Sequence, residues 1–183
     1  VGFFKGFRAV YGPADLVRAV PEVLAAVHGA RFELIGDGPE LAACKTLAVS
    51  LGAHHAIDWG PRRAHEEIPS CLARWQVSVM PSYSESFGVA ALESAAMRVP
   101  VVASRVGGIP DTVLDGETGL LVPPGSPSAL AEAITRLLHD GPLRHRMGEA
   151  GRAFVESRYA WDRTLDDWVA ALERARDLAC AMV

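Results

Sequence analysis

The sequence predicts an α/β domain in which helices cover both faces of a parallel sheet of about six strands. Two observations support this. Short apolar runs of strand length alternate along the chain with stretches of helical length. The segment 77–110 reads strand, helix, strand, which is a βαβ unit with both loops at one edge of the sheet. Together they indicate a Rossmann-like three-layer sandwich.

Length and composition fit one domain with a substantial core, since the chain has 183 residues of which 50% are hydrophobic. The formal net charge of −4 argues against a nucleic-acid partner. No apolar run approaches the roughly 18 residues of a membrane span, and no signal peptide is evident, so we expect a soluble, cytoplasmic protein. Cys44, Cys71 and Cys180 are expected to be reduced thiols.

The first two strands are each followed by a loop with polar or glycine residues. Residues 1–4 read as the end of a strand, as if the chain began inside a larger protein, and a helix is expected over 14–27. Lys5 and Arg8 lie in the loop between them and are either ligand contacts or solvated cations. A second strand over 31–35 ends at Gly36-Asp37-Gly38-Pro39, before a helix over 40–50. Gly36 either faces a ligand or serves a tight turn.

A third strand is expected over 54–59 and a short helix over 64–73. Trp59 is as suited to the core as to a ligand wall, and Arg62 or Arg63 could flank a ligand there. The spacing of His54, His55 and His65 fits no zinc pattern, and no D-x-D cluster is present. We therefore expect no metal and treat these histidines as surface or satisfied core residues.

The central unit places backbone N–H groups at a helix tip. A strand over 77–80 is followed by a helix over 89–97, with Ser84 or Glu85 as the expected N-cap. Ser86, Phe87 and Gly88, with Val89 next, should present free N–H groups that favour an anion. The next strand, over 99–103, leads to a glycine pair that ends in Gly108.

Two carboxylates flank this helix tip. If the segment between Glu85 and Glu93 is helical, their Cα atoms lie about 12 Å apart. A glycosidase pair needs carboxyl groups about 5 to 9.5 Å apart, so this spacing disfavours hydrolysis. The neighbours of Glu93 are mostly apolar, so its carboxylate needs a partner. Arg98 stands where a left-handed helix cap would favour glycine.

The remaining segment predicts a short last strand and three helices. The strand falls within 116–122, and the helices span about 127–139, 142–158 and 161–180. Trp161, Leu165, Trp168, Leu172 and Ala175 recur at helical spacing, which favours a packing face over a substrate platform.

In this order the motifs resemble the retaining nucleotide-sugar glycosyltransferases of family four, which have the GT-B fold. The resemblance rests on Gly36-Asp37-Gly38-Pro39, Pro81-Ser82, the E-x7-E pattern from Glu85 to Glu93, Gly107-Gly108-Ile109-Pro110 and residues 116–122. It implies that residues 1–183 are one C-terminal, donor-binding GT-B domain. The N-terminal acceptor domain would then lie outside this sequence, and residues 161–183 would form the helix that crosses back onto it.

The resemblance also implies roles for single residues. Lys5 and Arg8 would bind the donor diphosphate, Glu93 the ribose hydroxyls and Glu85 the hydroxyls of the donor sugar. Backbone groups near Trp59 and Arg62 would hold the base, and Gly108 would lie near the sugar phosphate. The catalytic set is thus Glu85, Lys5 and Arg8, with no metal.

The implied partners are a UDP-, GDP- or ADP-sugar and the missing N-terminal half, through which any peripheral membrane contact would be made. The isolated domain is expected to be inactive. Two alternatives stay open: a module that binds a sugar nucleotide without turnover, and a GT-B epimerase or phosphorylase.

Overall fold

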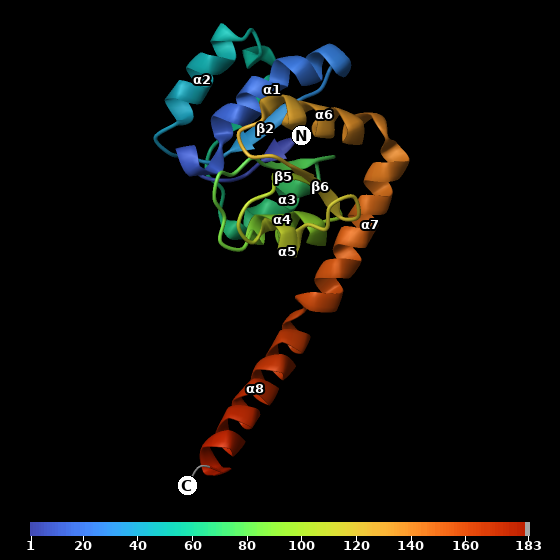
Figure 1. Cartoon of the computed structure of the whole chain (residues 1–183). Helices are drawn as coiled ribbons and strands as arrows, with labels where there is room; N and C mark the ends of the chain where they lie inside the picture. Colours follow the sequence, from blue (N-terminus) through green and yellow to red (C-terminus); the bar gives the residue numbers. More distant parts are fainter. Residues whose placement is uncertain (182–183) are drawn as a thin grey trace.

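A computed structural model describes residues 1–181, apart from the side chains of residues 162–164, 166–167 and 178–181. Its centre is a parallel sheet of six strands in the order β3-β2-β1-β4-β5-β6 (Figure 1). The strands are β1 (Gly2–Phe3), β2 (Phe32–Ile35), β3 (Ile57–Gly60), β4 (Ser78–Met80), β5 (Val101–Ser104) and β6 (Gly119–Val122). The predicted parallel six-stranded sheet is confirmed.

The strand order reverses direction between β1 and β4. Gly2 pairs in parallel with Glu33 on one side and with Ser78 on the other. Loops that leave these two strands at their carboxyl ends therefore diverge to opposite halves of the sheet, which opens a crevice between them. In open α/β sheets this is where ligands bind.

Helices cover both faces of the sheet, as a three-layer sandwich requires. On one face lie α1 (Pro13–Ala26), α2 (Leu41–Ser50) and α6 (Pro127–His139). On the other lie α3 (Ile68–Leu72), α4 (Val89–Ala96) and α5 (Ile109–Thr112), as Figure 1 shows. Alternate residues of a strand serve the two layers: Val102 joins the core under α1 and α6, whereas Val101 and Ala103 join the core under α4 and α5.

Two local expectations are wrong. Residues 54–56 form a short 3-10 helix, η2 (His54–Ala56), so β3 begins only at Ile57. The N-cap of α4 is Gly88 in the left-handed conformation, with φ of 93°, rather than Ser84 or Glu85. Because residues 85–88 are not helical, the estimate of the Glu85–Glu93 separation along one helix does not apply.

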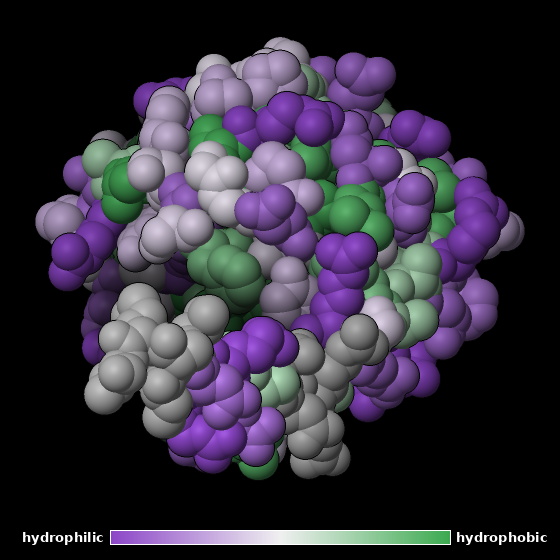
Figure 2. Space-filling view, turned by 60° about the horizontal axis from the view of Figure 1, so that its bottom comes forward, coloured by the Kyte–Doolittle hydropathy of each residue, from purple (hydrophilic) through white to green (hydrophobic). Residues whose placement is uncertain are grey.

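The last two helices are α7 (Gly141–Arg158) and α8 (Trp161–Ala181). α7 packs beside α4 and α6, whereas α8 extends away from the sheet (Figure 1). The expected packing face of α8 is not covered in this chain, since Trp161 and Trp168 are 77% and 65% exposed. Figure 2 shows the face from which α8 projects, where smaller hydrophobic areas are scattered among hydrophilic residues. The side chain of Cys180 lies outside the described residues, while Cys44 and Cys71 are buried free thiols.

The cap of α4 has the strained geometry that its sequence predicts. Arg98 has φ of 59°, the left-handed value at which glycine is favoured. Its Nε lies 2.8 Å from Oε1 of Glu149 on α7. Within the described residues, no helix is long and apolar enough to cross a membrane.

Candidate functional site

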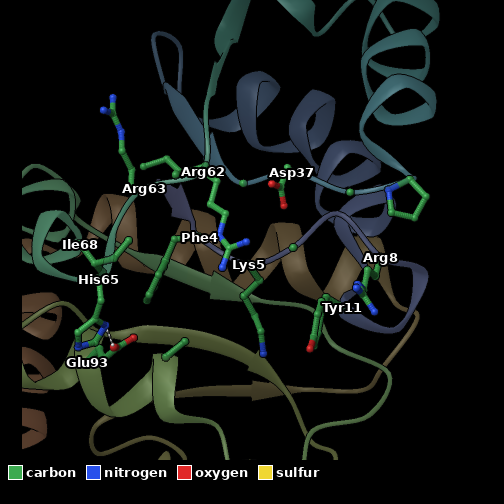
Figure 3. A pocket seen from close by; sticks show the side chains of 16 residues that line it. Phe4, Lys5, Arg8, Tyr11, Asp37, Arg62, Arg63, His65, Ile68 and Glu93 are labelled. Atoms are coloured by element: carbon green, nitrogen blue, oxygen red, sulfur yellow. Dashed lines mark ion pairs between the residues drawn. The ribbon is translucent and has the colours of Figure 1, made fainter.

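A cavity of about 700 Å³ lies at the carboxyl ends of β1, β2 and β3, beside the first turns of α4 (Figure 3). The cavity therefore lies at the crevice between β1 and β4, where the strand order reverses. Its lining combines cations, carboxylates, glycines and an apolar floor, and consists of Phe4, Lys5, Gly6, Arg8, Tyr11, Ile35, Gly36, Asp37, Gly38, Pro39, Arg62, Arg63, His65, Ile68, Ala90 and Glu93. A pocket with an apolar floor and a few converging polar groups is suited to a small-molecule ligand.

One wall of the cavity is made by two loops packed backbone against backbone. Gly36 has φ of 149°, and a Cβ there would lie 2.3 Å from the Lys5 carbonyl oxygen. A Cβ on Gly38 would lie 2.4 Å from the carbonyl oxygen of Phe7. The Phe7 amide donates a hydrogen bond of 2.7 Å to the Asp37 carbonyl. The glycines therefore serve the close approach of these loops, and Gly36 also lines the cavity.

Four cationic side chains belong to the cavity lining: those of Lys5, Arg8, Arg62 and Arg63. The Lys5 ammonium lies 4.3 Å from the centre of the Tyr11 ring and forms an ion pair with Glu85. Arg62 extends into the cavity, whereas Arg63 points away from it (Figure 3). Arg63 lies 3.4 Å from Glu67, and Arg8 lines the cavity as an exposed side chain. The arrangement concentrates positive charge beside the β1 loop.

The two carboxylates of the E-x7-E pattern have different surroundings. Glu85 lies in the loop before α4, where Lys5 pairs with it and the Ser82 hydroxyl lies 3.5 Å from its Oε2. Glu93 lies on α4 inside the cavity lining, with its Oε1 3.2 Å from Nδ1 of His65. Burial raises the pKa of the Glu93 carboxyl, and the neighbouring His65 acts in the opposite direction. A half-buried carboxylate of this kind is suited to accept hydrogen bonds.

The loop from Glu85 to Gly88 is held by the loop that follows β5. The Gly108 amide donates a hydrogen bond of 3.1 Å to the Glu85 carbonyl. Gly107 has φ of 48°, and a Cβ there would lie 1.8 Å from the same oxygen. Among the described residues, the amides of Ser86, Phe87 and Gly88 donate no hydrogen bond to a backbone carbonyl. Their N–H groups are thus available at the tip of α4, where the helix dipole favours an anion.

Other predicted residues lie beside the cavity rather than in its lining. Glu85, Ser86, Phe87, Gly88, Val89 and Gly108 are not among the residues that line it. The Lys5–Glu85 pair connects their loop to the cavity. The ring of Phe87, 43% exposed, instead packs 5.9 Å from that of Tyr159.

Trp59 takes the core alternative. Its ring lies 5.9 Å from that of Phe7 and packs against the main core, and it does not line the cavity. The Lys45 ammonium lies 5.9 Å from the centre of the Trp59 ring. Arg62, three residues after Trp59, lines the cavity.

Sequence reasoning did not predict several of the lining residues as site residues, among them Phe4, Tyr11 and His65. Phe4 directly follows β1 at the ligand edge, a position that could have identified it. Tyr11 and His65 come from a 3-10 turn, η1 (Ala9–Tyr11), and from η3 (His65–Glu67), and no spacing in the sequence connects them to Lys5 or Glu93. Among the residues that the structure describes, no cluster of His, Cys, Asp or Glu could hold a metal ion.

Comparison with known proteins identifies the family. The model of the family Glycosyl transferases group 1 matches residues 1–154. The chain belongs to this family. The recognition from the ordered motifs is therefore confirmed.

Individual group 1 relatives agree with this. The chain is 41% identical over 156 residues to the D-inositol 3-phosphate glycosyltransferase of Corynebacterium diphtheriae, covering 82% of this chain and 36% of that protein. The present chain thus spans well under half of the length of that relative. A solved C-terminal domain of a group 1 glycosyl transferase, LpcC of Francisella tularensis, matches with a TM-score of 0.79 and 28% identity, covering 86% of this chain and 84% of the other. This confirms the predicted fold of a C-terminal GT-B domain.

The fold is also that of Anabaena Alr3699/HepE, solved in complex with UDP-glucose. The TM-score is 0.85 at 23% identity, covering 95% of this chain and 48% of that one.

Proposed function

We propose that this group 1 domain binds a nucleoside-diphosphate sugar and that, with an N-terminal acceptor domain, it transfers the glycosyl group with retention of configuration. The observation that carries the proposal is the meeting of three features at one crevice: the Lys5–Glu85 pair, the free N–H groups before α4, and Glu93 in the adjoining cavity. Each matches one part of such a ligand.

The diphosphate would lie between the β1 loop and the tip of α4. Lys5 and Arg8 supply positive charge from one side, and the N–H groups of Ser86, Phe87 and Gly88 supply the dipole end from the other. As the bond to the sugar breaks, negative charge grows on the departing diphosphate. Groups already fixed around that charge stabilise the transition state more than the ground state.

The nucleoside would occupy the cavity proper. Glu93 lies in the lining with an oxygen available to accept hydrogen bonds from ribose hydroxyls. Phe4, Ile35 and Ile68 give an apolar floor that a planar base could cover, and Arg62 extends over it (Figure 3). A base between an apolar surface and a guanidinium is favoured by dispersion and cation–π attraction.

Glu85 would contact the donor sugar. Its loop lies on the far side of the diphosphate site from Glu93, and Lys5 holds its carboxylate in place. The two acids would thus bind the two polyols of one ligand. The exposed apolar residues of α8 support the proposal that residues 161–183 pack onto the acceptor half.

Calorimetric titration with UDP, GDP, ADP and their hexose derivatives tests the proposal. Glu93→Ala should weaken binding of the free diphosphate by about tenfold, because it removes hydrogen bonds to a charged acceptor. Glu85→Ala should weaken only the sugar-bearing form. Glu66→Ala is the control, because Glu66 is exposed and does not line the cavity.

Equal losses for both ligands in both variants would contradict the assignment of the two acids. Joining the domain to its N-terminal half and adding an acceptor then tests turnover. Binding without release of the nucleoside diphosphate in the joined protein would instead show a binding module.

A further inference from the structure

His65 contacts the cavity from an element that sequence motifs do not connect with Glu93. His65 is the first residue of η3, which follows the loop after β3, whereas Glu93 lies in the second turn of α4. Its Nδ1 lies 3.2 Å from Oε1 of Glu93, and the two side chains lie side by side in Figure 3. The contact therefore joins the loop after β3 to the helix after β4.

The position of His65 is fixed although its side chain is 80% exposed. The Glu67 carboxylate accepts a hydrogen bond of 2.9 Å from the Ala64 amide, which closes the turn in front of His65. Ile68, directly after η3, is 9% exposed and packs with Leu72 in the core below the cavity. A fixed backbone lowers the entropic cost of holding the imidazole against Glu93.

The other charged groups of the cavity are directed elsewhere. Lys5 pairs with Glu85, and Arg63 pairs with Glu67. Within the described part of the chain, neither Arg8 nor Arg62 forms an ion pair with Glu93, whereas His65 contacts that carboxylate. One Glu93 oxygen is thereby held, while the carboxylate still has lone pairs for a ligand.

We propose that His65 is a positioning residue for Glu93, which fixes the carboxylate in the orientation that accepts both ribose hydroxyls of a nucleoside diphosphate. The inference rests on the proposed function and names a further residue of the same site. Without His65 the Glu93 side chain would have to be ordered at the moment of binding, so ligand affinity would fall.

The effect of His65 should depend on the ribose hydroxyls and on Glu93, and this separates positioning from a general structural role. The 183-residue chain is titrated calorimetrically with UDP and GDP; the tighter binder is then compared with its 2′,3′-dideoxy form. His65→Ala should weaken the ribonucleotide by about tenfold and leave the dideoxynucleotide unchanged within about twofold. In a Glu93→Ala background, His65→Ala should have no further effect.

His65→Asn should restore part of the loss, because its amide nitrogen can take the place of Nδ1. Glu66→Ala, in the same turn but outside the cavity lining, is the matched control and should change neither affinity. Equal weakening of both ligands by His65→Ala, or a full effect in the absence of Glu93, would overturn the inference while leaving nucleotide binding intact. Failure of the unaltered chain to bind either nucleotide would overturn the proposed function and this inference with it.

Discussion

Lys5 and Glu85, eighty positions apart in the sequence, form an ion pair in which the two side chains are only 12% and 13% exposed. The pair joins the loop after β1 to the loop after β4, the two strands between which the sheet order reverses. It also places a cation at the proposed diphosphate subsite and a carboxylate at the proposed donor-sugar subsite.

Removing one partner of this pair should leave a poorly solvated charge. Lys5→Met and Glu85→Gln should each lower the free energy of unfolding by about 2 to 4 kcal/mol, and the double variant should lose less than their sum. Urea unfolding of the four proteins measures the coupling. The same cycle at the exposed pair Arg63 and Glu67 should give at most about 1 kcal/mol, and additive losses at Lys5 and Glu85 would refute the expectation.

Gly107 should tolerate no side chain, because a Cβ there would overlap the Glu85 carbonyl. Gly107→Ala is expected to cost clearly more stability than Gly52→Ala, measured by thermal or urea unfolding. Gly52 is the control for backbone strain, since it also has positive φ, 69°, but no atom lies within 4 Å of its added Cβ. Strain alone should cost about 1 to 2 kcal/mol at each site. Equal losses at both positions would show that the loops can separate.

Arg98 should be replaceable by glycine at little cost. Arg98→Gly relieves the left-handed strain, while Arg98→Ala keeps it, and both lose the exposed ion pair with Glu149. The glycine variant should therefore be more stable than the alanine variant by about 1 kcal/mol in urea unfolding. An alanine variant as stable as the glycine variant would mean that the helix end has rearranged.

Glu93 should make stability decrease as pH rises. Because burial raises its pKa above the ordinary 4.5, the folded chain binds this proton more tightly than the unfolded chain does. The stabilisation that the protonated Glu93 carboxyl adds to the folded state is fully present below about pH 4.5. It is lost as the pH rises through the pKa of Glu93 in the folded chain. In a His65→Asn background, the stability of the Glu93 protein relative to its Glu93→Gln variant should fall as the pH rises above about 4.5. A difference that rises with pH would reverse the sign of the shift.

Much of the fold could be predicted because its signals are local. The helix expected over 127–139 is α6 at those bounds, since apolar periodicity and Pro127 at its start mark it unambiguously. The third strand was predicted three residues too early. Residues 54–56 form the 3-10 helix η2 instead of the start of β3. In so short a segment, the pattern of apolar residues does not distinguish a 3-10 helix from a strand.

The site could be predicted only where a motif supplied it. Lys5, Gly36 and Glu93 were expected at the ligand edge and line the cavity. His65 was treated as an ordinary histidine because its contact with Glu93 arises from the packing of η3 against α4, which no spacing in the sequence encodes. The exposed apolar face of α8 was expected to be packed, since periodicity indicates an apolar face but not which molecule or domain covers it.

The backbone-to-backbone wall formed at Gly36 and Gly38 has a consequence for how such a domain can diversify. Neither loop can shift without breaking the other's close approach, so the outline of the cavity is set by main chain and resists gradual remodelling. In the proposed function, preference among donors would then be adjusted through exchangeable side chains, such as those of Phe4, Ile35 and Ile68, while the main chain stays the same. A designer who wishes to change the proposed ligand preference should vary those three positions and leave both glycines untouched.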